Sequence, residues 1–152
     1  MRQIWYGITN IIAWFPIIWR DRDWDHWYVY EILCFKLKRM EKLFRKYGHA
    51  VESESIADQI KEVIVGLDRL VEDDYCTDLY STIRKRWGEL EFAETGKDGY
   101  STLKATKVKT KEDEESYSTA IRECVKLEEK AIQEDLALVF DTMRDNIRSW
   151  WD

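Results

Sequence analysis

The sequence has few of the residues that interrupt regular structure, with one proline and six glycines among its 152 residues. This scarcity favours a few long helices over many short strands. Cysteine is also sparse. The three present, Cys34, Cys76 and Cys124, are widely spaced, and no Cys-x-x-Cys pair suggests zinc. We therefore expect three buried free thiols and a reducing compartment rather than a disulfide framework.

A membrane-spanning run is also missing. A spanning helix needs about 20 apolar residues, whereas the longest apolar stretch, Ile4 to Trp19, is shorter and contains Gly7, Asn10 and Pro16. It lacks the smooth aliphatic core and the small-residue cleavage site of a signal peptide. We therefore expect no membrane partner, and we expect this stretch to pack as a structured arm on the rest of the chain.

Catalytic and metal-binding motifs are scarce. The sequence contains no glycine-rich phosphate loop, no nucleophile elbow, and no serine or cysteine paired with histidine at a recognisable spacing. Asp21, Asp23, Asp25 and His26 are residues of ligand type, but no glycine follows to shape a calcium loop. We interpret these aspartates as helix caps, so we expect no metal, no cofactor and no enzymatic activity.

The formal net charge of −6 argues against general nucleic-acid binding, because neutralising phosphates requires a basic surface. The charge is unevenly distributed along the chain. Residues 31–47 contain six Lys or Arg against two Glu, and residues 76–111 contain eight Lys or Arg against five Asp or Glu. A local anion-binding patch is therefore compatible with an otherwise acidic protein.

Apolar residues recur at intervals of three and four over most of the chain, for example at Leu33, Leu37 and Met40. This period is typical of amphipathic helices, whereas Pro16 disfavours a helix in the residues before it. The pattern predicts an all-α fold, a bundle of about four helices with an aromatic N-terminal arm and a long C-terminal helix. The boundaries expected within a single domain, 1–152, are an irregular or briefly helical arm over 1–23, helices over 24–88, a loop or small hairpin over 89–112, and the long helix over 113–151.

The expected last helix has an apolar stripe that the other helices are too short to cover in one monomer, since neither glycine nor proline interrupts it from Asp113 to Trp150. We therefore expect a homo-oligomer in which the excess apolar length packs on another chain. Trp150 and Trp151 lie at the end of the sequence, and two aromatic residues there indicate a docking site on the same or a neighbouring chain.

Tryptophan and arginine are interleaved near the start of the chain, where five of the eight tryptophans fall between Trp5 and Trp27. Arginine forks pair with phosphate or carboxylate, and tryptophan faces stack on bases or on guanidinium planes. The same arginines, Arg20 and Arg22, have internal partners available in the neighbouring aspartates, and the sequence leaves both interpretations open. The candidate ligand-binding residues are Trp19, Arg20, Arg22, Trp24, His26, Trp27, Lys36, Arg39, Arg84 and Arg86.

Several segments of the chain resemble a family of small tailed-bacteriophage proteins of unassigned function. The resemblance implies a phage-encoded protein expressed in the cytoplasm of a bacterial host, and it implies no activity and no site residues. The segments that carry it are Trp14–Trp19 (WFPIIW), Asp21–His26 (DRDWDH), Phe35–Met40 (FKLKRM), Trp87-Gly88, and Trp150-Trp151-Asp152.

Three functions remain compatible with these observations. The first is a non-catalytic binding protein that sequesters a small anionic signalling nucleotide, as an anti-defence protein would. The second is an inhibitor or accessory factor that binds a host or phage protein. The third is a nucleotide-processing enzyme, which ranks last because the sequence shows no catalytic residues.

Overall fold

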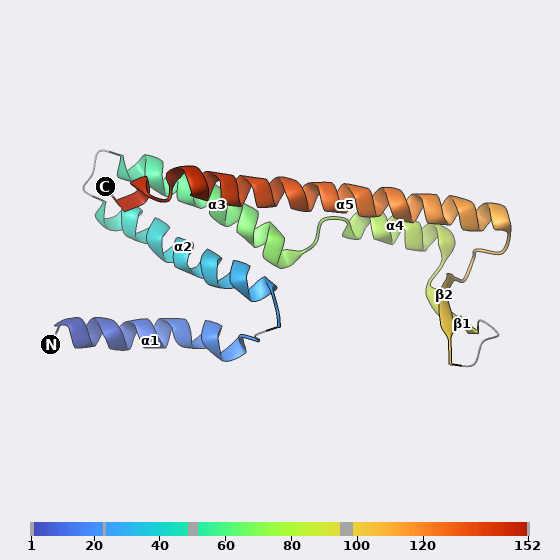
Figure 1. Ribbon diagram of the computed structural model, residues 1–152, viewed down its shortest axis with the longest axis horizontal. Coiled ribbons are helices and arrows are strands. Elements are labelled where there is room, and N and C mark those ends of the chain that lie inside the picture. Colours follow the sequence, from blue (N-terminus) through green and yellow to red (C-terminus); the bar gives the residue numbers. More distant parts are fainter. Residues whose placement is uncertain (1, 23, 49–51, 95–98, 152) are drawn as a thin grey trace. The chain divides into compact units, whose positions relative to one another are not determined.

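A computed structural model describes residues 2–22, 24–48, 52–94 and 99–151, and its described part is mostly helical (Figure 1). The all-α class, the small hairpin and the long C-terminal helix are as predicted. The elements are α1 (Arg2–Arg20), α2 (Trp27–Tyr47), α3 (Ser53–Glu72), α4 (Thr77–Trp87), β1 (Leu90–Glu94), β2 (Ser101–Ala105), α5 (Lys111–Asn146) and a short 3-10 turn, η1 (Ser149–Trp151).

The chain divides into two compact units. The first comprises residues 1–73 and 135–152, and the second comprises residues 74–134. Helix α5 is continuous over 36 residues, so residues 111–134 of this helix belong to the second unit and residues 135–146 to the first. The sequence pattern, which we treated as one domain, does not reveal this division.

Helix α3 supplies most of the core of the first unit. Ile60, Val63 and Leu67 are fully buried, and their spacing of three and four places them on one helical face. Leu37 of α2 and Val139 of α5 are buried as well, so that α3 is covered from two sides. The structure thereby confirms the apolar face expected for this helix.

Gly66 of α3 lies close against Val139 of α5. A Cβ atom at this position would lie 2.8 Å from Val139 Cγ2. Replacing Gly66 with alanine is therefore expected to lower the free energy of unfolding by about 1–3 kcal/mol, because the added methyl group must displace its neighbours. Urea denaturation followed by circular dichroism measures the difference.

Gly7→Ala is the matched control for Gly66→Ala. A Cβ at Gly7 would meet no described atom within 4 Å. Alanine has the higher helix propensity, so this substitution should leave stability unchanged or raise it by up to about 1 kcal/mol. Equal losses from the two substitutions would contradict the close packing at Gly66.

The N-terminal arm forms one long helix, α1, and the prediction of an irregular or briefly helical arm over 1–23 was wrong. Helix α1 continues through Pro16, although the missing N–H removes one backbone hydrogen bond. Packing explains the difference, because the Trp14 ring meets the Phe35 ring of α2 edge to face, with centroids 4.7 Å apart. Tertiary contacts of this kind override the local preference of the residues before a proline.

Helix α2 begins at Trp27, a few residues later than the sequence predicts. The N-cap is His26 rather than the expected aspartate, and Asp25, one residue earlier, accepts a hydrogen bond of 3.1 Å at its Oδ1 from the Trp27 N–H. This contact satisfies one of the free N–H groups at the start of the helix. Asp23 lies outside the described residues.

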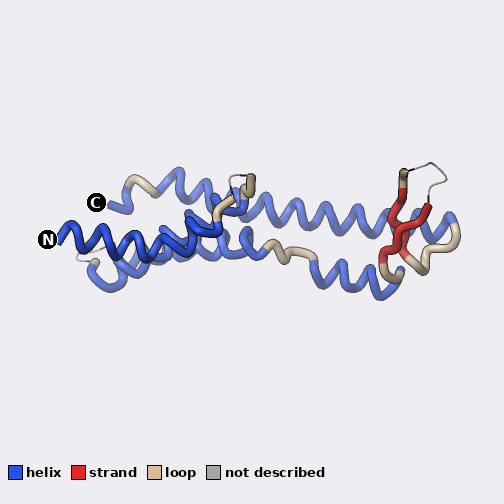
Figure 2. The backbone as a smooth tube through the Cα atoms, turned by 90° about the horizontal axis from the view of Figure 1, so that it is seen from below, coloured by secondary structure: helices blue, strands red, loops and turns tan. Residues whose placement is uncertain are grey.

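The second unit consists of α4, the hairpin and the first part of α5 (Figure 2). The strands pair antiparallel, with Leu90 opposite Ala105 and Glu94 opposite Ser101. Helix α4 stops at Gly88, as predicted. The φ angle of Gly88, 87°, lies in the left-handed region that favours glycine. Trp87 is buried beside it and packs edge to face on Tyr117 of α5.

All three cysteines are free and buried, as predicted. Cys76 and Cys124 lie close together in the second unit, where the Cys76 thiol contacts the Cys124 carbonyl oxygen at 3.8 Å. Burial raises the pKa of the Cys76 thiol, and the neighbouring Cys124 raises it further. This thiol is therefore protonated at neutral pH.

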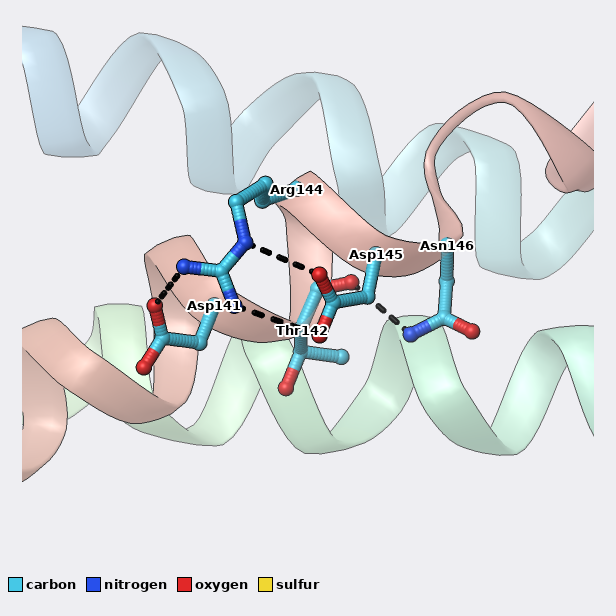
Figure 3. Close-up of polar contacts among 5 residues, drawn as sticks. All are labelled: Asp141, Thr142, Arg144, Asp145 and Asn146. Atoms are coloured by element: carbon cyan, nitrogen blue, oxygen red, sulfur yellow. Dashed lines mark hydrogen bonds and ion pairs between the residues drawn. The ribbon is translucent and has the colours of Figure 1, made fainter.

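The last turns of α5 lead directly to a docked tryptophan. Arg144 pairs with Asp141 at 2.8 Å and with Asp145 at 2.9 Å, and the Asn146 amide donates to the Thr142 carbonyl oxygen (Figure 3). Hydrogen bonding from Arg144 lowers the pKa of the Asp145 carboxyl group. The chain then turns through η1, and Trp150 becomes fully buried, which confirms the docking site expected for this residue.

Candidate functional site

A cleft of about 230 Å³ opens in the first unit, between α1, α2 and α3. It combines apolar walls with two cations, two carboxylates and a thiol. Its lining residues are Ile17 and Arg20 from α1, Glu31, Cys34, Phe35 and Lys38 from α2, and Asp68 and Val71 from α3.

The cleft forms because α1 and α2 run antiparallel. Trp14 of α1 contacts Phe35 of α2, and one turn earlier on α1 the Asn10 side chain accepts a hydrogen bond of 2.7 Å from Arg39. This register brings Arg20, at the end of α1, to the first turns of α2. The sequence places an arginine at this point directly after the apolar stretch, so the cation lies at the rim of an apolar wall.

Lys38 is not free to bind a ligand. Its Nζ lies 2.6 Å from Asp68 Oδ1, and this hydrogen bond raises the pKa of the ammonium group. The Cys34 thiol donates to the same carboxylate oxygen at 3.2 Å. Burial, followed by the contact with Asp68, raises the pKa of Cys34 to about 11. The thiol is therefore protonated at neutral pH and is a poor nucleophile.

Arg20 is the cation of the cleft that forms no ion pair with a carboxylate of the described residues. Its Nε donates to the Pro16 carbonyl oxygen at 3.2 Å, which orients the guanidinium group. Among the described residues no ion pair joins Arg20 to Asp21 or Asp25. Arg22 likewise donates to a backbone oxygen, that of Asp21, at 2.8 Å. Neither Arg20 nor Arg22 is thus ion-paired with Asp21 or Asp25.

Glu31 contributes an acceptor on the same side of the cleft. Its Oε2 is buried without a hydrogen-bond partner among the described residues. Desolvation raises the pKa of the neighbouring Tyr28, and the Glu31 charge raises it further, whereas Arg20 and Arg22 act in the opposite direction. The cleft therefore offers a guanidinium donor and an unused acceptor, a pair that suits a ligand with both an anionic group and a hydroxyl group.

The candidate tryptophans near the end of α1 and the start of α2 differ in exposure. Trp19 is 72% exposed and Trp24 is 83% exposed, so both rings are free to stack on a ligand. Trp27 is half-buried and meets the Tyr30 ring edge to face. The exposed His26 ring lies 5.1 Å from the Trp27 ring.

Of the ten candidate residues, only Arg20 is among the described residues that line the cleft. Lys36 is exposed on α2, and Arg39 is engaged by Asn10 and lies over the Phe35 ring. Arg84 and Arg86 belong to the second unit. There Arg84 pairs with Glu89 at 3.4 Å, and the Arg86 guanidinium lies over the Trp87 ring at 4.8 Å.

The second unit has a basic depression of its own, about 210 Å³ in volume, between β2 and the start of α5. Three lysines line it, namely Lys104, Lys109 and Lys111, together with Glu114. Flexible lysines are weaker organisers of an anion than an oriented guanidinium group, and they lose more rotamer freedom on binding. We therefore place the candidate site at Arg20.

Four polar residues of the cleft escaped sequence reasoning, namely Glu31, Cys34, Lys38 and Asp68. Each lies on an amphipathic helix, where the sequence alone indicates an ordinary core or solvent-facing position. The sequence held one signal for the site. Asp68 is a charged residue that directly follows Leu67, which is buried in α3, and its side chain reaches α2. Partners 30 residues apart cannot be matched from one sequence.

Among the described residues, no three His, Cys, Asp or Glu side chains are arranged to hold a metal ion. Nor is any described helix long and apolar enough to cross a bilayer. Comparisons of the chain with protein-family models, with curated proteins and with solved structures gave no match.

Proposed function

We propose that this is a phage-encoded, non-catalytic binding protein of the bacterial cytoplasm that sequesters a small anionic ligand, with a signalling nucleotide as the favoured class. The observation that carries the proposal is the oriented Arg20 guanidinium group in the cleft, which no described carboxylate pairs with. Sequestration of such a signal is the action of an anti-defence protein.

The volume of the cleft limits which part of the ligand enters it. A site for a drug-sized ligand occupies about 300–1,000 Å³, whereas this cleft measures about 230 Å³. It therefore accommodates a phosphate or a sugar hydroxyl group, with the base outside. Trp24, which is exposed in the turn between α1 and α2, is suited to stack on the base.

The non-catalytic part of the proposal rests on the state of the polar groups. The Cys34 thiol is held protonated, and Asp68 is occupied by Lys38 and Cys34. Glu31 remains as an acceptor, without a second group beside it in the cleft to activate a nucleophile. Binding is the action that these groups support.

Arg20→Gln is expected to weaken binding of the anionic ligand by about 10-fold to 100-fold, since it removes a charge-assisted hydrogen bond worth about 1.5–3 kcal/mol. Isothermal titration against a panel of cyclic and ADP-ribose-type nucleotides measures the loss. Lys109→Gln is the matched control, because it removes an exposed cation from the depression in the second unit. Ligand recovered after heat denaturation should be chemically intact.

Three outcomes would contradict this function. Unchanged affinity in Arg20→Gln would remove the cleft from the binding site. Equal losses in Arg20→Gln and Lys109→Gln would indicate nonspecific attraction by surface cations. Conversion of the nucleotide during incubation would favour a processing enzyme over a sequestering protein.

A second function, binding of a host or phage protein as an inhibitor or accessory factor, is favoured by a different observation. Helix α1 exposes large apolar side chains along much of its length. Surfaces of this kind mark interaction sites. Co-purification of one host protein in stoichiometric amount, without any nucleotide binding, would establish this function in place of the first.

We further propose that the protein acts as a homo-oligomer. The apolar stripe of α5, from which the sequence predicts association, is largely covered, because Val139 is buried and Ile132 and Leu136 are half-buried. The uncovered apolar surface lies on α1 instead.

A further inference from the structure

Helix α1 carries an apolar stripe on the side away from α2. Asn10 and Trp14 face α2, and Ile17 lines the cleft. The residues of the outer stripe, in contrast, are between 45% and 72% exposed. They are Ile4, Trp5, Ile8, Ile11, Ile12, Phe15, Ile18 and Trp19.

These eight residues form one continuous surface, which we call the outer arc. At 3.6 residues per turn they cover an arc of about 140° without a polar or charged interruption. An apolar stripe of about 100° or more normally faces a core. A helix that is apolar on its packed side and on its outer side is expected to be buried from both.

The positions of the outer arc have the same spacing counted from either end. Counting inward, Ile4 corresponds to Trp19, Trp5 to Ile18, Ile8 to Phe15, and Ile11 to Ile12. Every position of the arc thus has a mirror position that is also in the arc, and three of the four pairs match an isoleucine with an aromatic residue. Tyr6, the other large exposed residue of α1, has its mirror position at Ile17, in the cleft.

Any unbroken stripe on a helix has this mirror order, so the order does not select the partner, but it sets the register that an antiparallel pair of identical helices adopts. In a twofold interface residue i contacts residue j of the other copy, and residue j contacts residue i in return. Pairing a large ring with a branched aliphatic side chain lets the two surfaces interdigitate. An apolar depression of about 420 Å³, lined by Ile11, Phe15 and Ile18 among others, follows one edge of the arc and offers room for the opposing side chains.

The area of the outer arc is also sufficient. A large side chain has about 150–250 Å² to bury, so eight that are 45–72% exposed present roughly 800 Å². A standard stable interface buries about 800 Å² on each partner, and the largest apolar patch of a typical monomer is about 300–600 Å². The arc is therefore larger than the usual largest apolar patch of a monomer, and it matches the area that one partner of a standard interface buries.

We propose that the outer arc of α1 binds the outer arc of a second copy of this chain, antiparallel and across a twofold axis between Ile11 and Ile12. The inference rests on the homo-oligomer part of the proposed function and is independent of the anion cleft. We commit to a second copy because the arc presents about the area that one partner of a standard protein interface buries, and adsorption to lipid is the alternative outcome of the test. The contacts of α1 with α2 lie on its other side, so the arc is available while α1 remains packed.

Cross-linking of single cysteine variants tests the register. In the proposed pair, position 8 of one copy faces position 15 of the other, so Ile8→Cys mixed with Phe15→Cys forms a disulfide-linked dimer under mild oxidation. Each variant alone forms several-fold less, because its two cysteines lie at separate levels of the helix pair and beyond disulfide reach. The native cysteines are buried, and the wild-type chain measures their background.

Sedimentation velocity over a range of concentrations tests the interface itself. Ile11→Glu places two like charges at the twofold axis and is expected to weaken dimerisation at least tenfold. Leu127→Glu is the matched control, since Leu127 is 54% exposed on α5 and lies outside the arc. Circular dichroism of both variants verifies the fold.

Four results would overturn the proposal. One is a wild-type chain that stays monomeric at every concentration. Another is equal self-cross-linking by each cysteine variant alone, which indicates a parallel pair. The third is an arc occupied by lipid, seen as Ile11-dependent binding of the monomer to vesicles of phosphatidylglycerol and phosphatidylcholine. The last is weakening of the dimer by Leu127→Glu to the same degree as by Ile11→Glu. None of these results would alter nucleotide binding to Arg20, which is measured separately.

Discussion

Replacing Trp150 with alanine is expected to lower the free energy of unfolding of the first unit by about 3–5 kcal/mol, as is usual for large-to-small substitutions in a core. Trp150 is fully buried, although it lies two residues from the end of the chain. Its Nε1 donates a hydrogen bond of 3.1 Å to Gln59 Oε1 on α3. The substitution leaves both a cavity and an unpaired amide oxygen.

Trp24→Ala is the matched control, because it removes the same side chain from a site that is 83% exposed. Its effect on stability should stay within about 0.5 kcal/mol, as for most surface substitutions. Urea denaturation followed by tryptophan fluorescence and by circular dichroism compares the two variants. A loss below about 1 kcal/mol in Trp150→Ala would show that the terminal turn η1 is frayed in solution.

The helical elements of the core were predictable because their residues repeat with a regular period. The buried residues Ile60, Val63 and Leu67 follow the three-and-four spacing that indicates a helix. The end of α4 was also predictable, since Gly88 is a strong local stop signal. Both predictions rest on local rules, and such rules can be applied to a single sequence.

Helix α1 was not predictable, because a local rule and a tertiary contact disagree there. Pro16 disfavours helix in the preceding residue, whereas Trp14 gains its packing on Phe35 only if the helix continues. The location of the uncovered apolar surface was missed for the same reason. The stripe of α5 is also apolar in sequence, and it is covered because α3 and α4 pack on it.

The candidate site was predictable in part. Arg20 was identified from its place between tryptophans and aspartates, and the structure sets it in a cleft. Arg39 was expected to bind a ligand; its Nη2 donates to Asn10, a partner 29 residues away, and its Nη1 is buried without a hydrogen-bond partner among the described residues. The carboxylates Glu31 and Asp68 were missed, because their role depends on which helices meet.

Replacing Arg69 with methionine is expected to lower the free energy of unfolding by about 2–4 kcal/mol. Arg69 reaches Asp135 with two nitrogens, and its Nε lies 2.8 Å from Asp135 Oδ2. Asp135 is only 6% exposed. Loss of the arginine leaves a buried carboxylate without its main counter-charge, which costs about 3–5 kcal/mol when the site is fully buried. The partial exposure of Arg69 reduces that cost.

Arg144→Met is the matched control, since Arg144 also pairs with two carboxylates but is 67% exposed in its side chain. Solvent screens this cluster, so its loss should destabilise the protein much less than the loss of Arg69. The double variant Arg69→Met/Asp135→Leu should recover part of the loss, because it removes the buried charge together with its partner. Urea denaturation of the four proteins gives the comparison. Similar losses for Arg69→Met and Arg144→Met would mean that burial of Asp135 does not set the strength of its ion pair, which would contradict the tight contact of α3 with α5.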